Sequence, residues 1–291
     1  MGCINEITGH TKLTGLLGSP VAHSKSPLMH NEAFRLLGLD YVYLCFDVKE
    51  ENLKTTFEGL KQLNIAGFNC TMPNKTVICE MLDELSPAAK MIGAVNTVVN
   101  KDGKFIGYNT DGIGYMQSVK DAGFNIIGDT MTLLGAGGAA SSILVQAALD
   151  GVKNINVFSI KDRFWEKAEK MIESVNSNTD CKACLFELGN DDILGDSISQ
   201  SKILTNATSV GMAPNTDNCI IKDFSLLNEK LIVSDVIYNP METKLLQMAK
   251  EKGCPTFNGL YMLLYQGAEA FKIWTGKEMP VKEIKNKYFA E

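Results

Sequence analysis

The sequence predicts an α/β fold divided into two domains. Short β-rich runs alternate with helical stretches from Lys12 onward, and this alternation implies crossover connections and parallel sheets with helices on their faces. A fresh strand, a sharp glycine turn and a helix begin at Thr130, as expected where a second α/β unit starts. The chain has 291 residues, of which 45% are hydrophobic and 21% charged, so it is long enough for two buried cores and too apolar to be disordered.

The first half of the chain predicts an α/β domain of its own. Apolar and β-branched runs indicate strands, and apolar residues at helical spacing indicate helices between them. We expect strands at residues 13–17, 41–46, 65–70 and 94–99, and helices at residues 26–37 and 50–63.

The second half shows the same alternation, and a helix at residues 112–122 would join it to the first. The segment 259–291 is expected to form helices without strands, and its periodicity assigns it to neither domain. We expect the other strands at residues 131–134, 155–158, 182–186, 203–206 and 231–235, and the other helices at residues 138–149, 162–175 and 241–252.

Charge and cysteine content exclude several classes of function. Lys plus Arg is 28 and Asp plus Glu is 34, and the resulting net charge of −6 lacks the basic excess that a broad nucleic-acid-binding surface needs. The apolar runs are far shorter than the roughly 18 to 20 residues that span a bilayer, and the first residues lack the apolar core of a secretory signal. The eight cysteines are scattered, and the pair Cys181 and Cys184 has no further ligands nearby. We therefore expect no nucleic-acid or membrane partner, no metal site, and a cytoplasmic protein with reduced thiols.

The run at residues 130–140 has the pattern GxGxxA directly after a buried strand and at the head of an apolar helix. In a dinucleotide-binding turn the first glycine permits the tight bend, the second lets the backbone approach a pyrophosphate, and the free helix N–H groups face the phosphates. The alternative is a tight turn that binds nothing, but the next strand completes a βαβ unit and favours dinucleotide binding. The candidate cofactor residues of this turn are Gly135, Ala136, Gly137, Gly138 and Ala139.

Cofactor choice is expected to depend on the residues that end the second strand of this unit, Ser159, Lys161 and Asp162. The Asp162 carboxylate could hold the ribose hydroxyls and would repel a 2′-phosphate, whereas Lys161 could attract one. Asp162 could instead be the N-cap of the following helix. The balance favours NAD, with NADP possible.

Four polar clusters follow predicted strands in the first half, where open α/β sheets place their ligands. They span residues 23–27, 69–75, 93–97 and 108–112. Ser26 before a proline is also a good helix start, and Asp111 could be no more than a helix N-cap. A lone lysine such as Lys75 is usually a solvated surface group. Each cluster by itself therefore has a purely structural alternative.

Taken together, the motifs resemble those of the shikimate dehydrogenase family along nearly the whole chain. Seven motifs occur in the family's order, which is a highly specific match. The amino-acid sequence at residues 72–75, 238–240 and 274–277 most resembles that of the quinate/shikimate dehydrogenase branch. The matching motifs are HSKSP at 23–27, N-x-T-x-P-x-K at 69–75, GAVNT at 93–97, NTDG at 109–112, GAGGAA at 135–140, NAT at 206–208, and the segment 259–266 with its Met-Leu-Leu-Tyr-Gln.

The resemblance implies an N-terminal substrate-binding domain, residues 1–111 with 257–291, and a Rossmann-like NAD(P)-binding domain, residues 112–256. The C-terminal helices would return to the first domain and bring Gln266 to its polar clusters. NADP-specific members carry Asn-Arg after the second cofactor strand, where this chain has Ser159 and Ile160. The missing arginine agrees with a preference for NAD.

The resemblance also implies the reaction, which is reversible oxidation of shikimate to 3-dehydroshikimate, of quinate to 3-dehydroquinate, or of both, within aromatic amino acid biosynthesis (the chorismate pathway). Lys75 and Asp111 would form the acid–base pair, because a hydride can leave a carbinol carbon only if the hydroxyl proton also leaves. Substrate contacts are expected from Ser24, Ser26, Asn69, Thr71, Asn96, Tyr238 and Gln266. Further cofactor contacts are expected from Asn206, Thr208, Val236 and Gly259.

Two other functions remain open at this point. The chain could be a non-catalytic sensor of shikimate or quinate, since folds outlive their chemistry, although Lys75 and Asp111 are both present. It could also be a two-domain dehydrogenase of another hydroxy acid, which the paired serines disfavour. The sequence leaves the preference between quinate and shikimate open, and it is compatible with a monomer or a homodimer.

Overall fold

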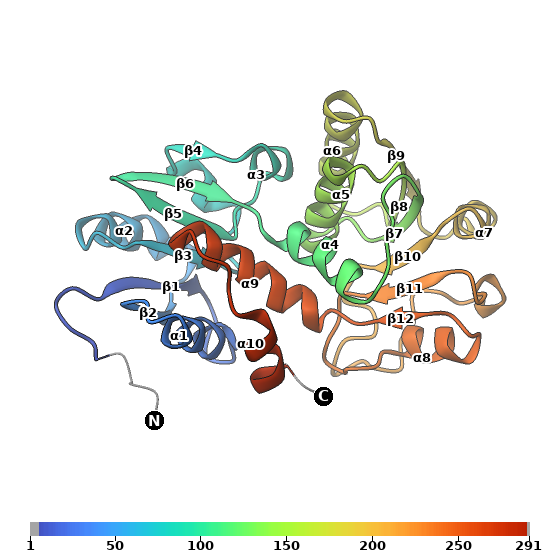
Figure 1. Cartoon of the computed structure of the whole chain (residues 1–291). Coiled ribbons are helices and arrows are strands. Elements are labelled where there is room, and N and C mark those ends of the chain that lie inside the picture. Colours follow the sequence, from blue (N-terminus) through green and yellow to red (C-terminus); the bar gives the residue numbers. More distant parts are fainter. Residues whose placement is uncertain (1–5, 290–291) are drawn as a thin grey trace. The chain divides into compact units, whose positions relative to one another are not determined.

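The computed structural model describes residues 6–289, which form two compact α/β units (Figure 1). One unit runs to Thr110 and resumes at Leu264, and the other spans Asp111–Leu263. The predicted fold class, α/β with a two-domain layout and C-terminal helices that return to the first domain, is confirmed. The roles of the two units in binding substrate and cofactor remain predictions.

The first unit contains a six-stranded mixed sheet with the order β2-β1-β3-β5-β6-β4. The strands β1, β2 and β3 are parallel, but β5 is antiparallel to both β3 and β6, so the prediction of purely parallel sheets is wrong here. The strands are β1 (Lys12–Gly18), β2 (Tyr41–Asp47), β3 (Gly67–Cys70), β4 (Glu84–Leu85), β5 (Thr97–Lys101) and β6 (Lys104–Tyr108).

The missed strand β6 follows a two-residue hairpin turn at Asp102 and Gly103. Both residues have positive φ, 53° and 87°, as a type I′ turn requires. Asp-Gly between two β-rich runs is a strong hairpin signal, and it was available in the sequence. The hairpin lets the chain reverse without a crossover helix, which is why this half of the sheet is antiparallel.

The helices of the first unit are α1 (Ser26–Leu36), α2 (Glu50–Gln62), α3 (Pro87–Ile92), the part of α9 (Leu260–Thr275) from Leu264, and α10 (Val281–Tyr288). The core beneath the sheet is aromatic and aliphatic, with Phe57, Phe68 and Phe105 in edge-to-face contact. The helix α10 packs on α1, and the Lys287 ammonium lies 2.9 Å from the Glu32 carboxylate. This contact attaches the C-terminal segment to the N-terminal helix.

The second unit has six parallel strands in the order β12-β11-β10-β7-β8-β9. The chain leaves β7 in one direction to β8 and β9, then returns to the other side of β7 for β10. A change of direction of this kind opens a crevice at the carboxyl ends of the two central strands, which here are β7 and β10. The strands are β7 (Thr130–Leu134), β8 (Asn154–Ser159), β9 (Lys182–Glu187), β10 (Ile203–Asn206), β11 (Ile232–Asp235) and β12 (Thr256–Phe257).

Local capping interactions set the helix starts in this unit, and two of them differ from the prediction. The Asp162 carboxylate accepts the Phe164 N–H at 2.9 Å, and this turn delays α6 from residue 162 to 165. The Thr243 hydroxyl caps α8, which therefore starts at residue 244 and not 241. The helix α7, which the periodicity did not reveal, is capped by Asn190. The helices are α4 (Asp111–Asp121), α5 (Gly138–Asp150), α6 (Trp165–Asn178), α7 (Asp191–Ser199) and α8 (Lys244–Glu251).

Two general features concern the described part of the chain. Within residues 6–289, no helix is both long and apolar enough to cross a membrane. The seven cysteines in the same range are free thiols, and Cys3 lies outside the described residues.

Candidate active site

In the first unit, Ser24 and Ser26 stand between the end of β1 and the start of α1. The Ser24 hydroxyl oxygen accepts the Ser26 N–H at 3.2 Å, so the two hydroxyls are held by one short turn. Burial raises the pKa of the Cys45 thiol and of the Tyr43 phenol, and the Ser24 and Ser26 hydroxyls respectively act in the opposite direction, so each hydroxyl lies near a side chain of β2. Both serines therefore face β2, next to the first turn of a helix whose N–H groups favour an anion.

Asn69, at the end of β3, joins these serines to the next polar cluster. Its Oδ1 accepts the Tyr43 hydroxyl at 2.8 Å, and its Nδ2 donates to the Asn96 carbonyl and to the Thr97 hydroxyl, both at 3.0 Å. Asn69 is 6% exposed and Asn96 3%. Buried amides with this many partners are held in one orientation.

The hydrogen-bond network continues from Asn96 to the two other motifs of the unit. The Asn96 Oδ1 accepts the Thr110 N–H at 2.8 Å, and its Nδ2 lies 3.5 Å from the Gln266 Oε1 on α9. Residues that are 170 positions apart in the sequence thus meet in one network. Three of the predicted substrate-binding residues, Asn69, Asn96 and Gln266, are connected by hydrogen bonds.

Lys75 and Thr71 lie in the turn that follows β3. The Lys75 carbonyl accepts the Val95 N–H at 2.8 Å, and the Thr71 N–H donates to the Leu17 carbonyl at 2.9 Å. Burial raises the pKa of the Cys70 thiol, and the positive charge of Lys75 acts in the opposite direction. The Lys75 charge therefore lies near Cys70, the last residue of β3, which directly follows Asn69.

Asp111 is the first residue of α4 and the first residue of the second unit. It follows Thr110, whose hydroxyl and N–H are both bonded to Asn96. The chain therefore leaves the polar network directly into Asp111. Tyr238, the remaining predicted substrate residue, belongs to the second unit and is 40% exposed.

The glycine turn of the second unit fits a dinucleotide phosphate. Gly135 ends β7 with φ +109°, a conformation that favours glycine, and a Cβ there would lie 2.9 Å from Thr208. Gly137 and Gly138 face open space, because a Cβ on either would meet nothing within 4 Å. The helix α5 starts at Gly138 and continues for 13 residues, so its unpaired N–H groups point at this opening. Ala136 and Ala139 flank the opening and are partly buried.

A second network lies at the same edge of this sheet, after β10 and β11. The buried Asp235 carboxylate accepts the Asn206 amide at 3.1 Å, the Thr243 hydroxyl at 2.8 Å and the Ile237 N–H at 3.0 Å. Burial raises the pKa of Asp235 to about 6 in spite of these bonds. The Asn206 Oδ1 in turn accepts the Thr208 hydroxyl at 2.7 Å.

The remaining predicted cofactor residues of this edge are placed by the same network. The Val236 N–H donates to the Asn206 carbonyl at 2.9 Å. A Cβ on Gly259 would lie 1.9 Å from the Val236 carbonyl oxygen, so only glycine allows this approach. Asn206, Thr208, Val236 and Gly259 therefore lie together around the carboxyl ends of β10 and β11.

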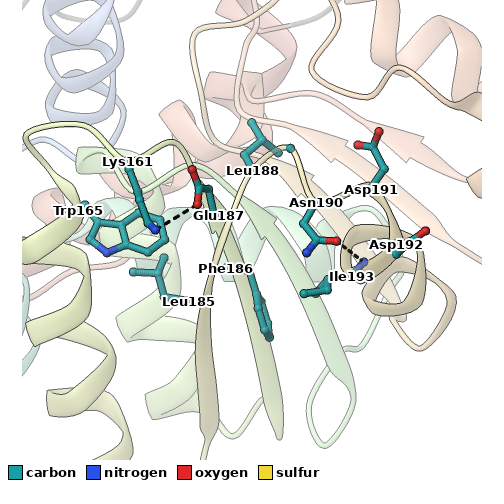
Figure 2. A pocket seen from close by; sticks show the side chains of 11 residues that line it. Lys161, Trp165, Leu185, Phe186, Glu187, Leu188, Asn190, Asp191, Asp192 and Ile193 are labelled. Atoms are coloured by element: carbon teal, nitrogen blue, oxygen red, sulfur yellow. Dashed lines mark hydrogen bonds and ion pairs between the residues drawn. The ribbon is translucent and has the colours of Figure 1, made fainter.

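Three predicted cofactor residues lie at the end of β8, where a Rossmann-like unit binds the adenosine ribose. They are Ser159, the last residue of the strand, and Lys161 and Asp162, which follow it. Ser159 is buried, and its carbonyl accepts the Leu188 N–H at 2.8 Å. The Lys161 ammonium lies 3.1 Å from the Glu187 carboxylate and 5.5 Å from the centre of the Trp165 ring. Figure 2 shows Lys161 and Glu187 turned toward each other.

These two side chains line a pocket of about 730 Å³ between the start of α6 and the start of α7 (Figure 2). The glycine turn does not line this pocket, and Lys161 is the single predicted cofactor residue that does. The pocket is therefore adjacent to the predicted ribose position and separate from the phosphate turn. Within residues 6–289, no three His, Cys, Asp or Glu side chains gather as metal ligands.

Three participants in these networks were not identified from the sequence. Tyr43 and Thr97 lie in runs that alternate like ordinary strands. A strand pattern of this kind does not indicate a function. Asp235 ends the apolar strand β11, and a carboxylate at the carboxyl end of a parallel strand could have been selected on that ground.

Two family models match the chain. The model described as "Shikimate dehydrogenase substrate binding domain" matches residues 16–98, in the first unit. The model described as "Shikimate 5'-dehydrogenase C-terminal domain" matches residues 259–287.

Several proteins are similar over nearly the whole length. A curated protein of Listeria monocytogenes (strain F2365), named shikimate dehydrogenase (NADP(+)), is 55% identical over 284 residues, which are 98% of each chain. The crystal structure of shikimate 5-dehydrogenase from L. monocytogenes in complex with shikimate and NAD has a TM-score of 0.94 at 55% identity, covering 96% of this chain and 97% of that one. Quinate dehydrogenase from Corynebacterium glutamicum in complex with NAD has a TM-score of 0.85 at 29% identity, covering 96% and 99%. The chain described here belongs to the shikimate dehydrogenase family.

Proposed function

We propose that this protein is an NAD-preferring oxidoreductase that reversibly converts shikimate to 3-dehydroshikimate, with Lys75 and Asp111 as its acid–base pair. The observation that carries the proposal is the hydrogen-bond network of the first unit, which joins Asn69, Asn96 and Gln266 next to the turn that bears Lys75. Many neutral donors and acceptors beside one amine suit a polyhydroxy acid, because a missing hydroxyl would leave a buried partner unpaired.

Each part of the site has a distinct task in this reaction. The serine hydroxyls and the N-terminus of α1 bind the substrate carboxylate, and the amides bind ring hydroxyls. Lys75 accepts the hydroxyl proton as the carbon–hydrogen bond breaks, and Asp111 orients the amine. The nicotinamide cofactor, when bound, takes up the hydride. The open glycine turn and the N-terminus of α5 bind its pyrophosphate.

Steady-state rates for shikimate and quinate with NAD and NADP test the proposal in one set of measurements. We expect reduction of NAD by shikimate at enzyme concentrations well below that of the substrate. A binding sensor would bind shikimate in a titration and reduce no cofactor. A dehydrogenase of another hydroxy acid would leave both substrates unchanged and oxidise another member of a hydroxy-acid panel.

Quinate is a second candidate substrate, because quinate dehydrogenase from C. glutamicum has the same fold over the whole chain. Quinate carries a further ring hydroxyl beside its carboxylate, so it would compete for the same serines. A kcat/KM for quinate within tenfold of that for shikimate would assign the protein to the dual-specificity branch.

The partners of Lys161 support the proposed preference for NAD. Its ammonium is neutralised by Glu187 at 3.1 Å, and the carboxylates of Glu187 and Asp162 would repel a 2′-phosphate. We expect a kcat/KM with NAD above that with NADP, and a Glu187→Gln variant that raises kcat/KM with NADP by about fivefold while kcat/KM with NAD changes less than twofold. A wild-type protein that favours NADP would contradict the preference. A Glu173→Gln variant, which removes a carboxylate from α6 and leaves Glu187 of β9 in place, is the matched control.

We also infer that the enzyme works in the cytoplasm, within aromatic amino acid biosynthesis. The free thiols of the described residues suit a reducing compartment. Localisation of a tagged full-length chain tests this inference.

A further inference from the structure

Tyr43 is a fully buried residue of β2 that connects two parts of the substrate site. Its hydroxyl donates to the Asn69 Oδ1 at 2.8 Å, and it lies near the Ser26 hydroxyl, which opposes the burial that raises the pKa of the phenol. Strand β1 lies between β2 and β3 in the sheet, so the phenol spans the width of one strand to reach Asn69. One side chain thus links the carboxylate-binding serines to the hydroxyl-binding amides.

The directions of these hydrogen bonds follow from the groups at the end of the network. The Asn96 carbonyl can only accept, so the Asn69 Nδ2 must face it and the Asn69 Oδ1 must face Tyr43. The single proton of the phenol is therefore committed to Asn69. Any hydrogen bond between Tyr43 and Ser26 then uses the serine proton and the phenol oxygen. Because both amide hydrogens of Asn69 are occupied, this residue can meet a substrate hydroxyl only as an acceptor.

The helix that begins with Ser26 also holds Tyr43 in place. The Asn31 side chain donates to the Tyr43 carbonyl at 2.9 Å and accepts the Tyr43 N–H at 2.8 Å. The His30 ring stacks on the Tyr43 ring, with centroids 4.5 Å apart and planes 20° apart. Trp274 of α9 closes the same aromatic cluster, with its ring centroid 5.9 Å from that of Tyr43.

His30 takes part in this cluster by packing alone. It is fully buried, and neither ring nitrogen has a hydrogen-bond partner among the described residues. Burying an imidazole with no polar partner costs free energy. The favourable contribution of His30 is the contact of its flat ring with the Tyr43 ring.

We propose that Tyr43 is a positioning residue for substrate recognition, which orients Ser26 and Asn69 and is itself held by His30 and Asn31 of α1. This inference rests on the proposed function. It adds a residue that touches no substrate and a specific consequence, which is that Asn69 presents an acceptor and no donor to the ring hydroxyl it meets.

Removal of the phenol hydroxyl is expected to affect substrate binding selectively. In a Tyr43→Phe variant the buried Asn69 Oδ1 loses its donor, and the Ser26 hydroxyl loses the phenol oxygen near it. Both groups can then turn away from the geometry that the substrate needs. The predicted cofactor turn belongs to the other unit.

The test compares Tyr43→Phe with Tyr115→Phe in steady-state assays with shikimate and NAD. Tyr115 is a matched control, because its buried hydroxyl also bonds two partners, Thr205 and Ser234, in the second unit. We expect Tyr43→Phe to raise the KM for shikimate about tenfold, with kcat within threefold and the KM for NAD within twofold of wild type. Tyr115→Phe should leave the KM for shikimate within twofold.

Two further variants separate positioning from a merely structural role. If Tyr43 acts through Ser26, the KM of the Ser26→Ala/Tyr43→Phe double variant rises by less than the product of the single effects. His30→Leu keeps the phenol and removes only the stacked ring, and it should raise the KM for shikimate about threefold. This variant decides the question if Tyr43→Phe does not fold.

Several outcomes would overturn the proposal. An unchanged KM for shikimate in folded Tyr43→Phe, or in His30→Leu when Tyr43→Phe is unfolded, removes Tyr43 from substrate recognition. Equal increases in the KM values for shikimate and NAD would indicate general loosening of the fold. A wild-type protein that does not oxidise shikimate overturns the proposed function, and this inference with it, and the wild-type assay alone identifies that case.

Discussion

A Lys75→Ala variant is expected to oxidise shikimate with a kcat at least about 100-fold below wild type, which is the loss that follows removal of a general acid–base group. In the first unit this amine belongs to the turn after β3, the strand that contains Asn69, one of the amides proposed to bind ring hydroxyls. Without it, the substrate hydroxyl has no amine to accept its proton. Stopped-flow and steady-state rates with NAD measure the effect.

The same variant should still bind its cofactor, because the glycine turn lies in the other unit. A fluorescence titration with NAD is therefore expected to give a Kd within twofold of wild type. Lys104→Ala is the matched control, since Lys104 is a surface lysine of the same unit paired with Glu84 at 3.1 Å. A Lys75→Ala enzyme with the wild-type kcat would remove Lys75 from the mechanism.

His30 is expected to make the first unit sensitive to acid. Burial lowers the pKa of His30 from 6.5 to about 3. Between these pH values the unfolded chain binds a proton that the folded chain does not, so the stability falls as the pH falls from 6.5 toward 3. At about 1.4 kcal/mol per pH unit, the whole interval corresponds to a loss on the order of 5 kcal/mol.

Denaturant unfolding of wild type and His30→Leu between pH 7.5 and pH 4.5 measures this contribution. The experiment uses a Trp165→Phe background, so that Trp274 reports on the first unit. The free energy of unfolding of wild type minus that of the variant should be constant above pH 6.5 and should decrease by about 1.4 kcal/mol for each pH unit below it. A difference that does not change with pH would show that His30 is not a buried neutral base.

Two other groups also contribute to the pH dependence, and the comparison of variants cancels them. Hydrogen bonds from Arg35 and Lys287 lower the pKa of Glu32 to about 2, and that stability is lost as the pH falls from 4.5 toward 2. Burial raises the pKa of Asp235 to about 6, so its carboxylate costs stability as the pH rises from 3.8 to 6. Asp235 therefore opposes His30 in the same pH range, and the wild-type profile alone would underestimate both.

Local rules predicted those parts of the fold whose signals lie within a few residues. The strand, glycine turn and helix at residues 130–150 were identified because strand periodicity, the GxGxxA pattern and helix periodicity occur in one short segment. The parallel sheet of the second unit followed from the alternation of elements. The antiparallel β5–β6 hairpin was missed, although Asp102 and Gly103 signalled it, because the alternation was extended over a region where the chain turns back at once.

Some residues of the candidate site were selected from sequence motifs, and others were not. Ser26, Lys75 and Asp111 were selected because their motifs occur in a specific order. Tyr43, Thr97 and His30 were not, since a tyrosine or threonine in a strand and a histidine in a helix match ordinary core residues. Their contacts are with partners 13 (43 − 30) to 28 positions away in the sequence, and no local pattern encodes those partners.

The partners of the predicted cofactor residues after β8 also depend on the tertiary structure. The sequence showed both a lysine and an aspartate after β8, and the balance of their opposite charges favoured NAD with NADP possible. The structure pairs Lys161 with Glu187 from the next strand, and it uses Asp162 to accept the Phe164 N–H.

By itself, therefore, the sequence of this protein determined the fold class and the position of the glycine turn, and it supplied the set of candidate site residues. These depend on covalent neighbours, backbone sterics and periodicity, which act over a few residues. Only the tertiary structure decided which polar groups are bonded to each other, and with them the roles of Tyr43, His30, Asp235 and Glu187. Hydrogen-bond direction, burial and ion pairing depend on distances between side chains, and those distances exist only after the sheets have assembled.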